Sequence, residues 1–89
     1  MFRLWAKAFQ NTHMLWDLVV EDATEDTRTH KIFHAIDRVC KEKDLPHPIW
    51  LDSNISDFKR ISATRFTRDS FVEEIPFDHL EIRVIEEDV

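Results

Sequence analysis

Hydrophobic and polar residues alternate over the first 21 positions of the chain, and this pattern predicts a β-hairpin over residues 2–9 and 13–21. We expect a three-residue turn at Gln10-Asn11-Thr12, with Asn11 in the left-handed conformation. Opposed residue numbers then sum to 22, and the pairs on one face are Phe2 with Val20, Leu4 with Leu18, Ala6 with Trp16 and Ala8 with Met14. All eight residues are apolar, and a slip by one position would scramble this face, so the pattern supports the register.

The other face of the predicted hairpin is mixed. It carries Trp5, Phe9, Leu15 and Val19 among charged residues. A fully solvated face does not normally hold four large apolar residues, so we expect something to cover part of it. These four residues are the predicted interaction face, through which the protein would bind itself or another protein.

The next segment has the periodicity of an amphipathic helix, predicted over residues 22–44. Asp22 and Glu25 have the spacing of a capping box at its start. Leu45-Pro46-His47-Pro48 ends it, because proline cannot continue a helix. The inward-facing stripe consists of Ile32, Phe33, Ile36, Val39 and Cys40.

The second half of the chain is less regular. Residues 49–51 (Ile-Trp-Leu) predict a short strand, and Asp52-Ser53-Asn54 predicts a turn that caps a second helix. This helix would run to about Arg65, with Ile55, Phe58 and Ile61 facing inward. Residues 66–77 are expected to form a loop. Alternation over residues 79–86 predicts a final, half-buried strand.

The predicted element order is therefore β-β-α-(β)-α-β, within a single domain of residues 1–89. This order indicates the α+β class. The economical arrangement is a small antiparallel sheet, made of the N-terminal hairpin and the C-terminal strand, with one long and one short helix packed on it.

Composition excludes several functions. None of the 89 residues is glycine, so the chain has no Walker-type phosphate loop, no G-x-G-x-x-G dinucleotide turn, no G-x-S-x-G elbow and no EF-hand calcium loop. The single cysteine, Cys40, excludes an intramolecular disulfide and a C-x-x-C site. Its place on the apolar stripe predicts a core residue and not a nucleophile. No cofactor is predicted.

The distribution of charged residues identifies one unusually basic segment. The net charge of −6 argues against nonspecific binding to nucleic acid or to an anionic membrane. However, Lys59, Arg60, Arg65 and Arg68 lie within ten residues that contain no acid. Such a segment can bind an anion or nucleic acid. Alternatively, it pairs with residues 73–88, which carry seven acids and one base.

A metal site is a weaker candidate. His30 and His34 are four residues apart on the outer face of the predicted helix, with Asp37 three further on. Two histidines at this spacing can chelate a divalent metal. The pattern lacks the H-E-x-x-H order and an evident third ligand, and a solvated helix face explains the same residues. A small metal-dependent hydrolase built on these residues or on Asp52 is therefore the last of three functional alternatives.

Several segments together resemble a known group of proteins. These segments are Asp26–Phe33, Pro48–Ile55, Thr64-Arg65-Phe66, Asp69-Ser70-Phe71 and Leu80-Glu81-Ile82. Over nearly its full length the chain resembles a family of short uncharacterised proteins from Gram-positive gut bacteria. The resemblance implies a self-standing, cytoplasmic bacterial protein, and it assigns no functional residues.

The leading functional hypothesis is a non-catalytic protein–protein interaction or regulatory module that self-associates. A nucleic-acid-associated regulator that uses the basic segment is the alternative. The longest apolar stretch, Met14 to Val20, is interrupted by Asp17 and is too short to span a bilayer. The sequence therefore predicts a cytoplasmic protein without a membrane partner.

Overall fold

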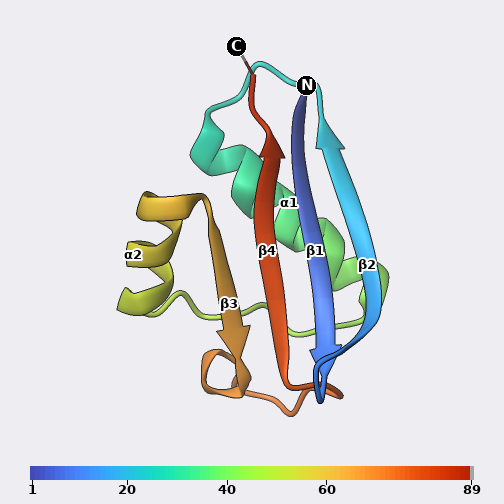
Figure 1. Ribbon diagram of the computed structural model, residues 1–89. Coiled ribbons are helices and arrows are strands. Elements are labelled where there is room, and N and C mark those ends of the chain that lie inside the picture. The colour runs from blue at the N-terminus through green and yellow to red at the C-terminus, as the bar shows by residue number, and fades with distance from the viewer. Residues whose placement is uncertain (89) are drawn as a thin grey trace.

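A computed structural model describes residues 1–88 of the chain. It shows a four-stranded antiparallel sheet and two α-helices, which confirms the predicted α+β class (Figure 1). The element order is β-β-α-α-β-β, with one 3₁₀ turn before the last strand. The elements are β1 (Phe2–Gln10), β2 (His13–Asp22), α1 (Arg28–Lys43), α2 (Asp52–Ile61), β3 (Ala63–Thr67), η1 (Arg68–Ser70) and β4 (His79–Glu86).

The strand order in the sheet is β2-β1-β4-β3. The C-terminal strand β4 thus lies in the centre, antiparallel to both β1 and β3. Helix α1 crosses behind the sheet in Figure 1, and α2 lies beside β3. The opposite face of the sheet, which faces the viewer, is not covered by any element within residues 1–88. We call it the open face.

The hairpin forms, but its predicted register is wrong by two residues. Leu4 lies opposite Val20, and Ala8 lies opposite Trp16. The turn contains two residues instead of three, which shifts the register by one, and an irregularity between Ala8 and Phe9 shifts it by one more. A shift by two leaves the side chains beyond this irregularity on their own faces, so the apolar pattern does not distinguish the two registers there. A bulge after Ala8 also places Met14 opposite Phe9. Met14 therefore leaves the predicted core face and is half-exposed.

Both residues of this turn have positive φ, 50° at Asn11 and 69° at Thr12. A two-residue hairpin turn of type I′ requires this conformation, for which Asn-Gly is the favoured pair. Threonine is β-branched and is strained there.

We expect Thr12→Gly to raise the free energy of unfolding by about 0.5–1 kcal/mol, since the gain from relieved strain exceeds the entropy cost of glycine. Urea unfolding followed by circular dichroism measures the change. Thr12→Ala is the control, because it removes the branch and keeps the Cβ atom. The strain argument fails if both variants have the same stability.

Helix α1 begins six residues later than predicted. Thr27 is its N-cap, and the Thr27 hydroxyl accepts the backbone N–H of His30 at 3.2 Å. The predicted capping box at Asp22 is wrong, because Asp22 is the last residue of β2 and pairs with Phe2. Its carboxylate instead accepts the backbone N–H and the hydroxyl of Thr24.

The segment between α1 and β4 differs from the prediction in three ways. Residues 49–51 form no strand. Helix α2 ends at Ile61 instead of about Arg65, since Ser62 adopts the left-handed conformation with φ 54°. Part of the predicted loop over residues 66–77 belongs to β3 and η1. Pairing of β3 with β4 accounts for the last two differences, because it is a long-range interaction that local pattern does not reveal.

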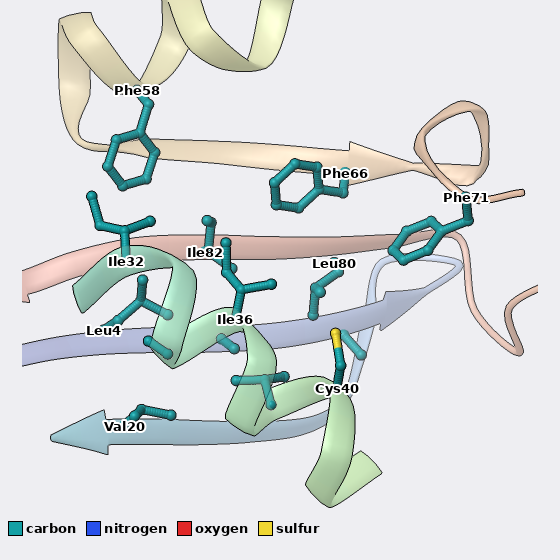
Figure 2. Packing of buried hydrophobic residues seen from close by; sticks show 14 of the residues in the cluster. Leu4, Val20, Ile32, Ile36, Cys40, Phe58, Phe66, Phe71, Leu80 and Ile82 are labelled. Atoms are coloured by element: carbon teal, nitrogen blue, oxygen red, sulfur yellow. The ribbon is translucent and has the colours of Figure 1, made fainter. Parts of the chain in front are cut away.

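The core lies between α1 and the sheet. Figure 2 shows Ile32, Ile36 and Cys40 of α1 directed toward side chains from the strands. The predicted inward stripe is confirmed for Ile32, Ile36, Val39 and Cys40. It is wrong for Phe33, which is 50% exposed. In α2, Phe58 is buried as predicted, whereas Ile55 and Ile61 are exposed. None of the helices within residues 1–88 is long and apolar enough to cross a membrane.

Candidate functional site

The four residues of the predicted interaction face lie on β1 and β2. Trp5 is the register partner of Val19, and Phe9 is the partner of Met14. Because alternate residues of a strand point to opposite faces, Trp5 and Phe9 share the open face, whereas their neighbours Leu4, Ala6 and Ala8 are buried under α1. The open face thus carries an apolar area at its β2 side.

Polar contacts hold the Trp5 side chain of β1 in place. The Trp5 indole N–H donates to the Asp17 carboxylate at 2.9 Å. The Lys7 ammonium lies 3.9 Å from the centroid of the Trp5 ring and 2.9 Å from the Glu81 carboxylate. Trp5 is therefore partly covered by its own chain.

Two titratable groups of β4 take part in this arrangement. Partial burial raises the pKa of the Glu81 carboxyl, but the hydrogen bond and charge of Lys7 outweigh burial and hold the pKa below its usual value. Partial burial, followed by the charge of Arg65, lowers the pKa of His79. His79 is therefore neutral at neutral pH. Its ring stacks on that of Phe9 with centroids 5.0 Å apart.

The most exposed apolar residues of this area lie on β2. Met14, Leu15 and Val19 are 49%, 50% and 42% exposed. Strand β2 is an edge strand of ten residues, and within residues 1–88 only β1 pairs with it. The predicted interaction face therefore adjoins a long, unpaired strand edge.

Comparison with known proteins identifies no family for this chain. No protein-family model, curated protein or solved structure matches the chain. The resemblance to short bacterial proteins stays a prediction, and the site has to be interpreted from its own residues.

The structure distributes the predicted basic segment over α2, β3 and η1. Arg60 pairs with Asp57 at 3.2 Å, and Arg65 lies opposite Glu81 in the sheet. Arg68 donates to the carbonyl of Phe77 at 3.2 Å and lies 3.5 Å from the carboxylate of Asp78.

Three of the four basic residues thus have an acid close to them. This arrangement favours internal charge pairing over one anion-binding surface. Nucleic-acid binding stays a prediction.

Two of the three candidate metal ligands, His30 and Asp37, are held by other partners. His30 contacts the Asp26 carboxylate at 2.8 Å, whereas Asp37 contacts His47 at 2.8 Å and Lys41 at 3.0 Å. The rings of His30 and His34 are 6.3 Å apart. Within residues 1–88, no three histidine, cysteine, aspartate or glutamate side chains form a group that could hold a metal ion. The structure does not bring the proposed hydrolase site together.

Cys40 is buried in the core, as the sequence predicted. Burial, followed by the charge of Asp37, raises the pKa of its thiol to about 11. The thiol therefore stays protonated at neutral pH, and a protonated thiol is a poor nucleophile.

Sequence reasoning missed a cavity between the two helices. The cavity has a volume of about 290 Å³ and is lined mainly by apolar side chains, together with Arg28 and Lys59. Of the predicted site residues, only Lys59 contributes to it. Phe33 and Ile55, two of its walls, have the sequence pattern of core residues. Nothing in the pattern distinguishes a residue that lines a cavity from one that fills the core.

Proposed function

We propose that this protein is a non-catalytic interaction module that self-associates by pairing its β2 strand with β2 of a second copy. The observation that carries this proposal is the ten-residue unpaired edge of β2, together with the half-exposed Met14, Leu15 and Val19. We further propose a cytoplasmic location, which the resemblance to the bacterial family implies.

Strand edges of this kind are usually protected. Natural proteins place lysine or proline on an edge strand, shorten it or cover it, because its free backbone N–H and C=O groups can pair with another chain. Strand β2 contains no lysine, arginine or proline. Its one irregularity is the bulge near Met14, at the hairpin end. Most of the edge is thus regular and available.

The β2 strand of a second copy would pair with the free backbone N–H and C=O groups of this edge and give a closed dimer. Two antiparallel β2 strands are related by a two-fold axis, so each copy offers the same surface and the association stops at a dimer. With the axis perpendicular to the sheet, both α1 helices lie on one side of a continuous eight-stranded sheet. The open faces join on the other side, where Leu15 and Val19 of each copy adjoin the partner strand.

Sedimentation velocity over about 1–500 µM protein tests the proposal. We expect the dimer to form within this concentration range, because a standard interface supports micromolar or tighter affinity. Val19→Lys places a charge on the paired edge and is expected to weaken the dimer at least tenfold, which corresponds to about 1.4 kcal/mol. Val72→Lys is the control, since Val72 is 86% exposed and lies outside the sheet. A wild-type protein that stays monomeric at the highest concentration refutes the proposal, as does equal weakening by both variants.

Hydrogen exchange distinguishes edge pairing from contact between open faces. In a β2-paired dimer, the outward backbone N–H groups of β2 become protected as the protein concentration rises. The other edge strand, β3, is the internal control, and its exchange stays independent of concentration. A dimer whose β2 amides gain no protection would contradict pairing through this edge.

A further inference from the structure

The cavity between α1 and α2 has a defined apolar interior. Ile32 and Phe58 lie at its inner end and are each 7% exposed. Figure 2 shows these two side chains facing one another between the helices. Phe33 and Ile55, both about half-exposed, form the outer walls. The space is therefore open to solvent at its mouth and apolar at its inner end.

Three aromatic side chains, Phe33, Trp50 and Phe58, line this interior. The Trp50 ring is nearly perpendicular to that of Phe33 (74°, centroids 6.1 Å apart) and to that of Phe58 (78°, 5.5 Å). Aromatic rings prefer offset-stacked or edge-to-face contacts. Because the cavity is lined by rings at right angles, a flat ring inside it can stack on one wall and meet another edge-on.

Two cationic side chains, Arg28 and Lys59, line the same cavity. Arg28 is already neutralised, since its guanidinium binds the Glu87 carboxylate at 3.0 Å and donates to the Ser62 hydroxyl. Lys59 is exposed and belongs to none of the ion pairs found among residues 1–88. One positive charge beside an apolar cavity thus remains uncompensated within the described part of the chain.

We propose that this cavity binds a small aromatic carboxylate, with its ring among Phe33, Trp50 and Phe58 and its carboxylate on Lys59. The volume of about 290 Å³ lies just below the usual range for ligand sites, about 300–1,000 Å³. A ligand of one or two rings therefore fits. The site lies on the helical side of the sheet, so it does not depend on the β2 interface proposed above.

Titration of ¹⁵N-labelled protein with 1-naphthylacetate tests this assignment by NMR. We expect saturable shifts at the Trp50 indole N–H and at the amides of Arg28, Ile55 and Lys59, with the signals of the open face unchanged. Octanoate and the neutral 1-naphthylacetamide are the comparison ligands. Both are expected to bind at least threefold more weakly, because octanoate lacks the ring and the amide lacks the charge. Equal binding of either ligand, or the absence of saturable shifts with 1-naphthylacetate, overturns the assignment.

Substitutions test the two parts of the site separately. Lys59→Gln is expected to weaken 1-naphthylacetate binding about threefold to fivefold, the effect of a partly exposed ion pair. Arg60→Gln is the matched control, since Arg60 follows Lys59 in α2 and pairs with Asp57. Phe33→Ala is expected to weaken binding about tenfold by removing an aromatic wall. Ile61→Ala, at an exposed position of α2 outside the cavity, should have no effect. A control that weakens binding as much as its partner variant refutes the proposed position of the ligand.

Discussion

Phe66→Ala is expected to lower the free energy of unfolding by about 3–5 kcal/mol, the range for removing a fully buried phenylalanine. Phe66 is 0% exposed, and Figure 2 shows it on β3 among the buried side chains. It lies opposite Leu80 in the sheet, and its ring is 5.1 Å from that of Trp50 at 87°. Alanine would lose this edge-to-face contact and leave a cavity between β3 and the segment that carries Trp50.

The expected loss is large for a domain of this size. Domains of about 90 residues have a total stability of roughly 5–13 kcal/mol. Urea unfolding, at one fixed protein concentration because dimerisation would stabilise the fold, measures the change. Phe33→Ala is the control, since its ring is half-exposed and its removal should cost about 1–1.5 kcal/mol. Equal losses for the two variants would contradict the assigned position of Phe66 in the core.

Asn54→Ala is expected to lower the free energy of unfolding by about 2–4 kcal/mol, because it removes hydrogen-bond partners from buried groups. The Asn54 side chain is buried in the third position of α2. Its Oδ1 accepts the backbone N–H of Leu51 at 3.0 Å. Its Nδ2 donates to the Thr64 hydroxyl at 2.9 Å and to the Arg65 carbonyl at 3.0 Å. One side chain thus caps α2 and also joins it to β3.

Two measurements distinguish this role from ordinary helix capping. Urea unfolding gives the total loss, and hydrogen exchange shows whether amides of α2 and β3 lose protection together, as expected if Asn54 joins the two elements. Ser53→Ala is the matched control on the preceding, exposed residue, with an expected change within about 0.5 kcal/mol. Loss of protection in the first turn of α2 alone would indicate a cap without a connecting role.

The sequence predicted the role of Asn54 only in part. A cap was expected at Asp52-Ser53-Asn54, and Asn54 does satisfy the start of α2 by accepting from Leu51. The bonds to Thr64 and Arg65 depend on β3, which the sequence pattern assigned to the end of a helix and to a loop. Short strands such as β3 are difficult to predict because their stability comes from pairing with a distant strand.

The candidate site was also predicted only in part from the sequence. Alternation placed Trp5, Phe9, Leu15 and Val19 on one face of a hairpin. In the structure Trp5 pairs with Val19, whereas Phe9 pairs with Met14 and Leu15 has no register partner. The unpaired edge of β2 follows from the strand order β2-β1-β4-β3, which no local pattern specifies. The cavity beside Lys59 was also unpredictable, because it requires the relative positions of α1, α2 and Trp50.

The sequence by itself determined in which segments apolar residues alternate with polar ones and in which they recur with helical spacing. These patterns determined the α+β class, the hairpin, the buried stripe of α1 and the final strand. These features depend on interactions between neighbours in sequence and on the direction of each side chain. The tertiary structure alone decided the hairpin register, the central position of β4, the edge position of β2 and the cavity between the helices. Each of these depends on contacts between residues far apart in the chain. A two-residue shift in register or a different strand neighbour leaves the local pattern unchanged.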